Sequence, residues 1–171
     1  PIVVCGGPCT YNSEPVADFA DICLIGEGED ELPELMDIYK KHKAMGFDRA
    51  AFLREVSHHQ SMYVPSLYDV EYNEDGTIKS FTPKFPDVPA KVQKRIVKDM
   101  DKAPFPKNLV MPFIQTVQDR IVLEVYRGCI RGCRFCQAGM VYRPVREKTP
   151  EVLNEQAKIL ADATGYSEIS L

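Results

Sequence analysis

Three of the chain's six cysteines lie within eight residues, in the stretch CIRGCRFC. Cys129, Cys133 and Cys136 have the spacing C-x3-C-x2-C, and thiolates are soft ligands that favour zinc and iron–sulfur clusters. On one loop that also carries Gly128 and Gly132, three thiolates could wrap a cubane cluster and bind three of its four irons. The fourth iron would keep an open coordination position for a small molecule, like the metal of an open catalytic site.

Three alternatives stay open for these cysteines: a zinc site completed by a distant residue, a redox disulfide, and buried thiols. Zinc would need a fourth ligand, and no histidine lies in the loop. At the other end of the chain, Cys5 and Cys9 repeat the C-x3-C spacing, but Cys23 follows fourteen residues later. Because Cys5 and Cys23 lie in apolar, strand-like segments, where cysteine behaves as a small hydrophobe, we expect no second cluster there.

The elements around the cysteine loop follow an α/β order. Alternating apolar residues over 121–126 predict a strand with one buried face. Thr149 suits an N-cap and Pro150 the first helical position, so a helix should begin there and end at Gly165. The terminal SEISL reads as a second strand, which completes a βαβ unit. The loop between Tyr126 and Thr149 has 22 residues, where about 2 to 6 are usual, and such length favours a function. The apolar face of the helix should consist of Val152, Leu153, Ala157, Leu160 and Ala161.

Residues 1–46 also read as α/β. Strands are expected over 2–5 and 21–25, followed by a glycine turn and a helix that ends near Gly46. The turn GEGEDE does not match GxGxxG, so we interpret it as a strand-to-helix turn rather than a nucleotide-binding loop. These elements are typical of the tail of an open, Rossmann-like α/β domain. The i, i+3, i+4, i+7 pattern predicts that the helix buries Leu32, Leu35, Met36 and Tyr39.

The proline-rich stretch 47–118 is expected to be a linker region between the two α/β segments. A short helix is predicted over 48–57, and the sequence YDVEYNEDGTIKSF predicts a β-hairpin that turns at Asp75-Gly76. His58 and His59 lie in a polar run between these elements, which favours exposed side chains over metal ligands. The basic segment 91–102 fits either a short amphipathic element or a strand that leads into a loop.

Composition limits the classes of partner. The formal net charge is -4 and the pI is near 5.4, so no global positive field would draw the chain to nucleic acid or to an acidic membrane. If the substrate were RNA, the basic segment 91–102 could contact its phosphates. No apolar run approaches the roughly 20 residues of a membrane span, and no signal-peptide pattern opens the chain. We therefore expect a cytoplasmic protein with no membrane partner. Because the chain begins at Pro1 and ends directly after a strand-like segment, we expect a piece of a longer protein.

The cysteine loop resembles the signature of radical S-adenosylmethionine (SAM) enzymes. The resemblance rests on C-x3-C-x-aromatic-C, with Phe135 before the last cysteine, and on RGC at 127–129 and FCQAG at 135–139. In addition, GGP at 6–8 followed by ICLIGEGEDELPEL resembles the end of the cobalamin-binding domain that precedes the radical SAM domain in one large subgroup. The order of these pieces agrees with that subgroup.

The resemblance implies a 4Fe-4S cluster on Cys129, Cys133 and Cys136, with SAM bound to the open iron and Phe135 near its adenine. It also implies reductive cleavage of SAM to a 5'-deoxyadenosyl radical, with an electron donor such as a flavodoxin or ferredoxin and an unknown substrate. Cobalamin would belong to the full-length protein. Around the loop, Arg127, Arg131 and Arg134 would either offset the charge of the cluster or be solvated.

The fold class predicted is therefore α/β in three parts: the tail of a cobalamin-binding-like domain over 1–46, a linker with a hairpin over 47–118, and the first βαβ unit of a radical SAM (β/α) barrel over 119–171. The predicted function is that of a radical SAM iron–sulfur enzyme, of which this piece alone is expected to be inactive. The alternative is a non-catalytic iron–sulfur or zinc-binding module. The substrate could be RNA or a small molecule.

Overall fold

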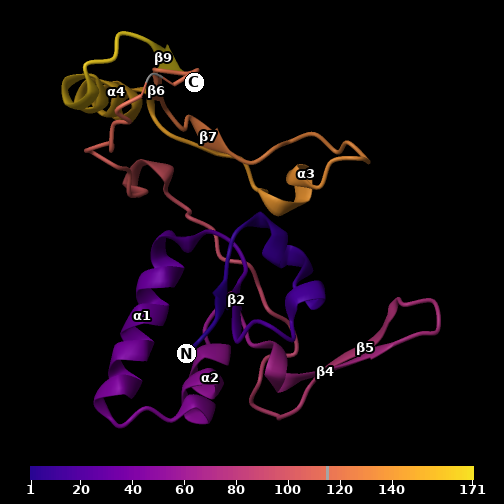
Figure 1. The fold of residues 1–171 in the computed structure, drawn as a ribbon. Helices are drawn as coiled ribbons and strands as arrows, with labels where there is room; N and C mark the ends of the chain where they lie inside the picture. Colours follow the sequence, from indigo (N-terminus) through magenta and orange to yellow (C-terminus); the bar gives the residue numbers. More distant parts are fainter. Residues whose placement is uncertain (115) are drawn as a thin grey trace. The chain divides into compact units, whose positions relative to one another are not determined.

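The computed structural model describes residues 1–114 and 116–171 (Figure 1). Contacts within it divide the chain into two units, Pro1–Val97 and Lys98–Leu171. Each unit is a mixture of helices and short strands, and none of the sheets formed by the described residues closes into a barrel. The mixed α/β character expected from the sequence is therefore confirmed, while the three-part division of domains stays a prediction.

The first unit is built on a three-stranded sheet in the order β1 (Val4–Cys5), β2 (Ile22–Leu24) and β3 (Met62–Tyr63). Strand β1 pairs with β2 in parallel, as an open α/β domain requires, and β3 adds an antiparallel edge that the sequence analysis did not predict. All three residues of β2 are buried. A central strand with both faces covered explains its uninterrupted apolar sequence.

The two faces of this sheet have different coverings. On one face Ile22 and Leu24 pack against α1 (Gly28–Ala44) and α2 (Arg49–Ser57), which lie side by side (Figure 1). On the other face Cys23 packs with aromatic and aliphatic residues of later segments. Asp48 caps α2, since its Oδ1 accepts the backbone amides of Ala50 and Ala51 at 2.8 and 3.2 Å. The predicted helix over 48–57 is thus confirmed.

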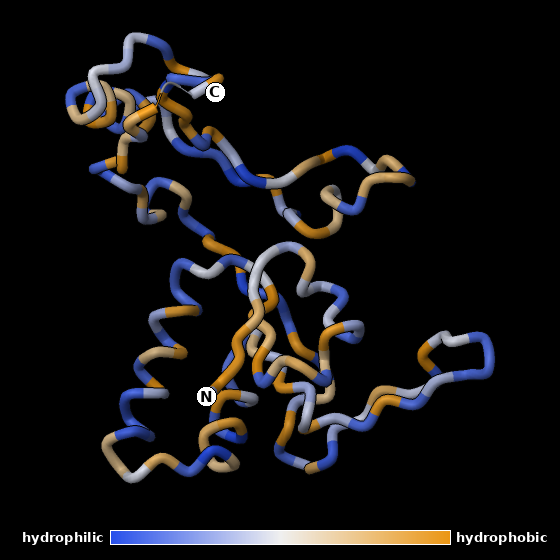
Figure 2. The backbone as a smooth tube through the Cα atoms, viewed as in Figure 1, coloured by the Kyte–Doolittle hydropathy of each residue, from blue (hydrophilic) through white to orange (hydrophobic). Residues whose placement is uncertain are grey.

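The predicted apolar face of α1 is confirmed for Leu35, which is buried in the core, and for Tyr39, which packs against it, and is wrong for the other two residues. Leu32 and Met36 are exposed, at 49% and 43%. Along the helix, hydrophilic and hydrophobic residues alternate (Figure 2), and the pattern leaves two apolar rows to choose between. The packing of α2 and β3 selects the row centred on Leu35 and Ile38. The residues of α1 that are buried are Glu31, Leu35, Ile38 and His42.

Between β1 and β2 the chain forms two short 3-10 helices, η1 (Pro8–Asn12) and η2 (Glu14–Val16). A third, η3 (Pro65–Leu67), leads into the predicted hairpin, whose strands are β4 (Tyr68–Tyr72) and β5 (Ile78–Pro83). The hairpin projects from the rest of its unit (Figure 1). Its turn is where the sequence predicted it, with Gly76 at a φ of 80° and the amide of Asn73 donating to the Thr77 carbonyl oxygen at 2.8 Å.

The basic segment 91–102 is extended rather than helical over most of its length. Arg95 forms a parallel β-bridge with Gly26, the turn residue after β2. Its amide donates to the Ile25 carbonyl oxygen at 3.0 Å, and its carbonyl oxygen accepts the amide of Glu27 at 3.1 Å. We call residues 94–97 the strap, because they lie across the turn between β2 and α1. This packing favours the interpretation of GEGEDE as a strand-to-helix turn.

The second unit contains the predicted βαβ arrangement. After the 3-10 helix η4 (Met100–Lys102), strand β6 (Ile121–Val122) pairs in parallel with β9 (Ile169–Ser170), and α4 (Pro150–Thr164) connects them. Ile121 and Leu123 are buried against α4 while Val122 is exposed, so the predicted alternation is confirmed. The strand expected over 121–126 is however regular only at its two ends, Ile121–Val122 and Tyr126–Arg127. The caps of α4 also agree with the sequence, since the Thr149 hydroxyl accepts the amide of Val152 at 3.5 Å and Gly165 is left-handed.

No helix among the described residues is long and apolar enough to cross a membrane.

Candidate iron–sulfur site

The cysteine loop is closed at its base by a short antiparallel pair of strands. Strand β7 (Tyr126–Arg127) precedes the cysteines and pairs with β8 (Arg146–Glu147), so the two ends of the loop lie together. The amide of Lys148 donates to the Val125 carbonyl oxygen at 2.9 Å and extends this closure. Between the strands lie the cysteines and the single-turn helix α3 (Ala138–Val141). The long loop therefore leaves the βαβ unit and returns to it through one pair of strands, which holds its two ends together.

All three predicted cysteine ligands are free thiols in this loop. Cys133 is exposed, and Cys129 and Cys136 are half-buried. The amide of Arg131 points at the Cys129 sulfur over 3.4 Å, and the amide of Cys136 donates to the Cys133 carbonyl oxygen at 3.1 Å. Free, accessible thiols with an amide directed at sulfur suit the thiolate ligands of an iron–sulfur cluster. The donor set thus fits the cluster that the resemblance implies.

The structure does not bring these thiols together into a preformed metal-binding group. Among the described residues there is no set of three or more Cys, His, Asp or Glu side chains that could hold a metal ion. The match to the cluster is one of ligand type, spacing and accessibility. Phe135 is 93% exposed, so its predicted place beside an adenine stays a prediction.

The start of the cysteine loop packs against residues 143–145, a contact that the sequence analysis did not predict. Gly128 has a φ of 107°, and a Cβ atom built on it would lie 2.6 Å from the carbonyl oxygen of Pro144. Arg143 donates from Nη2 to the Arg131 carbonyl oxygen at 3.0 Å and from Nε to that of Cys129 at 3.4 Å. The sequence offered no signal for these contacts, because Arg143 is one of several arginines near the cysteines.

Of the three arginines first considered for charge compensation, Arg127 is turned to another partner. Its guanidinium binds both carboxylate oxygens of Glu124, at 2.7 and 3.0 Å. Arg131 and Arg134 are exposed. The structure therefore associates Arg143, rather than Arg127, with the backbone of the cysteine loop.

The cysteines of the first unit behave as expected. Cys5 and Cys23 are directly paired in the register of β1 and β2, and Cys23 is fully buried. Burial raises the pKa of the Cys23 thiol. Cys9 is exposed in η1. The full burial of Cys23 agrees with its interpretation as a small hydrophobe, and Cys5 is half-buried.

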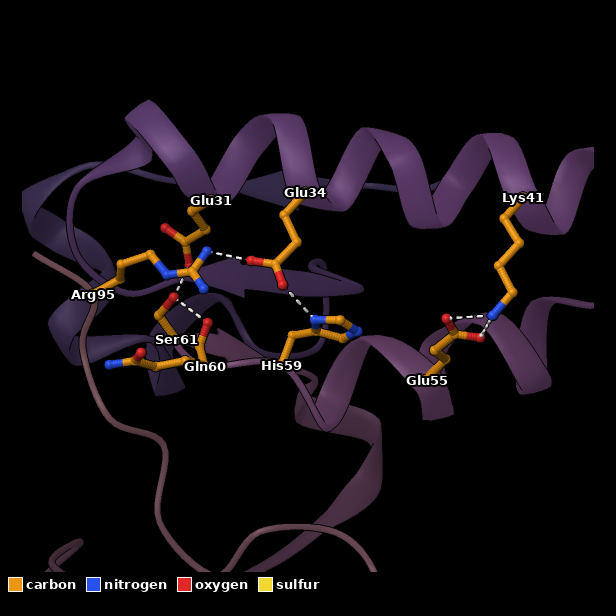
Figure 3. A network of polar contacts seen from close by, with 8 residues as sticks. All are labelled: Glu31, Glu34, Lys41, Glu55, His59, Gln60, Ser61 and Arg95. Atoms are coloured by element: carbon orange, nitrogen blue, oxygen red, sulfur yellow. Dashed lines mark hydrogen bonds and ion pairs between the residues drawn. The ribbon is translucent and has the colours of Figure 1, made fainter. Parts of the chain in front are cut away.

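A polar network joins α1 to the strap (Figure 3). Glu34 binds Arg95, and its Oε1 lies 2.6 Å from Nδ1 of His59. The Ser61 hydroxyl contacts Glu31, and Gln60 donates to the Lys94 carbonyl oxygen at 3.1 Å.

His59 is half-buried, contrary to prediction, because α1 carries a carboxylate partner for it, Glu34. His58 is exposed, as predicted, and faces Asp87 at 3.1 Å. Further along the two helices Lys41 and Glu55 pair at 2.8 Å.

Two carboxyl groups in this network have opposite pKa shifts. Burial raises the pKa of Glu31 to about 6, although the Ser61 hydroxyl and Arg95 oppose the shift. Its Oε2 atom is buried and has no hydrogen-bond partner among the described residues. For Glu34 burial also acts upward, but the hydrogen bonds from Arg95 and His59 outweigh it, and the pKa lies below its usual value. At neutral pH, the ionised carboxylate of Glu31 therefore lowers the free energy of unfolding.

Replacing Glu31 with glutamine is expected to stabilise the first unit at pH 7 by up to about 2 kcal/mol. The folded protein binds the Glu31 proton more tightly than the unfolded chain, so its free energy of unfolding falls as pH rises from 4.5 through about 6. Urea unfolding from pH 4 to 8 should show a gain for Glu31→Gln above pH 6 that vanishes below pH 4.5. The exposed Asp30→Asn variant of the same helix is the control, and equal profiles for both variants would contradict the prediction.

Comparison with known proteins finds similarity in a part of the chain outside the cysteine loop. Residues 1–65 match a family model described as the N-terminal part of radical SAM proteins. The chain is also similar to the uncharacterized protein MJ0966 of Methanocaldococcus jannaschii, with 27% identity over 155 residues. That alignment covers 85% of this chain and 25% of the relative, so the chain spans about a quarter of the relative's length.

The family match supports a radical SAM protein. It covers β1 through β3 and ends well before the cysteines, so it does not depend on the C-x3-C-x2-C spacing. Two separate parts of the chain thus point to the same class of protein.

Proposed function

We propose that the protein carrying this sequence is a radical SAM enzyme that holds a 4Fe-4S cluster on Cys129, Cys133 and Cys136. The observation that carries the proposal is the placement of three free thiols, spaced C-x3-C-x2-C, in one loop of a βαβ unit. The match of residues 1–65 supports the same class independently. When bound, such a cluster supplies the electron that cleaves SAM and generates a 5'-deoxyadenosyl radical.

The residues of this chain would bind and orient these groups. The three cysteines, as thiolates, would ligate iron and leave one iron open for the amino and carboxylate groups of SAM. Phe135, exposed beside Cys136, would contact the adenine. A flavodoxin or ferredoxin would be the electron donor. In the full-length protein the first unit would belong to a cobalamin-binding-like domain, which agrees with its parallel β1–β2 pair and the helix that follows. The setting would be cytoplasmic, and the substrate would be RNA or a small molecule.

Anaerobic reconstitution of the intact protein with iron and sulfide tests the proposal. We expect about four irons per chain and a paramagnetic resonance signal of the reduced protein that changes when SAM is added, because SAM binds the open iron. A cluster signal that is indifferent to SAM would favour an electron-carrying iron–sulfur module. Stoichiometric zinc without a cluster would favour the structural module. Either result would contradict the enzyme.

A further inference from the structure

Arg143 contacts the backbone of the cysteine loop at two points, at Cys129 and two residues after it. Its Nη2 atom donates to the Arg131 carbonyl oxygen at 3.0 Å, and its Nε atom donates to the Cys129 carbonyl oxygen at 3.4 Å. These two carbonyl groups lie on either side of Ile130. Within the same turn, the amide of Arg131 points at the Cys129 sulfur. One guanidinium therefore fixes the segment of backbone that directs an amide at the first cysteine.

The backbone that carries Arg143 is packed closely against the same segment. A Cβ atom on Gly128 would lie 2.6 Å from the Pro144 carbonyl oxygen and 2.7 Å from Cα of Val145. A Cβ atom on the buried Gly139 would lie 3.0 Å from the Arg131 carbonyl oxygen. At Gly128 this close approach requires glycine, and at Gly139 a Cβ atom would press on the Arg131 carbonyl group. The glycines thus allow the backbone on either side of Arg143 to lie close to the cysteine loop.

This geometry has two consequences for a thiolate ligand at position 129. An amide directed at a ligating sulfur, and a positive charge near it, both favour the thiolate and raise the reduction potential of a cluster. A ligand whose backbone is held in place also loses less conformational freedom when metal binds. Groups that orient metal ligands in this way typically contribute roughly 10- to 100-fold to metal affinity or activity.

We propose that Arg143 is the positioning residue of the cysteine loop: it holds the carbonyl groups of Cys129 and Arg131 so that the Arg131 amide faces the Cys129 sulfur. This inference rests on the proposed function. Lysine cannot replace arginine here, because a single ammonium on a flexible chain lacks the planar fork that reaches two carbonyl groups. It would keep the positive charge. The bridging and the charge of Arg143 can therefore be separated experimentally.

The test compares three variants of the reconstituted intact protein. We measure the rate at which the cluster loses iron to a chelator without oxygen, and the reduction potential of the cluster that is retained. For Arg143→Ala we expect roughly 10-fold faster loss and a lower potential. For Arg143→Lys we expect faster loss with a potential nearer to that of the wild type. Lys158→Ala is the control, since Lys158 is exposed on α4, outside the cysteine loop, and is expected to change neither quantity.

Loss rates and potentials of Arg143→Ala equal to those of Lys158→Ala would overturn the inference while the wild type still binds a cluster. A wild type that binds no cluster would contradict the proposed function, and this inference with it. If Arg143→Ala fails to fold by circular dichroism, the loss rate of Arg143→Lys against that of the charge-conserving Lys158→Arg decides. Equal rates for these two variants would equally overturn the inference.

Discussion

Replacing Cys133 with alanine should abolish binding of the 4Fe-4S cluster while the fold is retained. A cubane held by three cysteines has no spare protein ligand, so the loss of one thiolate leaves two irons without one. Cys133 is exposed, and its removal therefore leaves no cavity in the core. We expect the characteristic absorption, the iron and sulfide content, and the low-temperature resonance signal all to disappear, with activity of the intact protein lost completely.

Cys9→Ala is the control for that experiment, because Cys9 is also an exposed free thiol but lies in the first unit. It should keep the cluster at the level of the wild type. Without iron, thermal unfolding of both variants should match that of the iron-free wild type, which separates loss of a ligand from loss of structure. A Cys133→Ala protein with full iron content and an unchanged signal would refute the assignment of the cluster to this loop.

Replacing Gly26 with alanine should destabilise the first unit by about 3 kcal/mol or more. Gly26 has a φ of 132°, a region that residues with a Cβ atom rarely enter. A Cβ atom there would lie 2.2 Å from the carbonyl oxygen of Arg95 and 2.7 Å from its amide nitrogen. The strap would have to move, and the hydrogen bonds that join Arg95 to Ile25 and Glu27 would break.

The matched control is Gly28→Ala, since a Cβ atom at position 28 meets nothing within 4 Å and the residue begins α1. There alanine should be neutral or stabilise the helix by up to about 1 kcal/mol. Urea unfolding of both variants measures the difference in free energy. Hydrogen exchange at Glu27 and Arg95 should become fast in Gly26→Ala alone. Equal stability of the two variants would show that the strap does not need glycine at this turn.

The elements that the sequence predicted well are those with local causes. Helix α4 has its N-cap at Thr149, Pro150 at its start and left-handed Gly165 at its end, and each acts within one turn of chain. The hairpin follows from Asp75-Gly76 in the same way. The spacing of the three loop cysteines is likewise a local property of the sequence. The candidate site could therefore be identified before its surroundings were known.

The sequence by itself determined α1, α2, α4 and the hairpin turn, and which thiols share a loop, but not α3 or the 3-10 helices. Only the tertiary structure decided the buried face of α1, the addition of β3, and the support of the cysteine loop by Arg143. Each of these depends on a partner far along the chain or on the other side of a loop. Leu32 and Leu35 are equally apolar, and the packing of α2 and β3 alone decides which is buried. In the same way, nothing local distinguishes Arg143 from Arg134; the fold gives only one of them two carbonyl groups to hold.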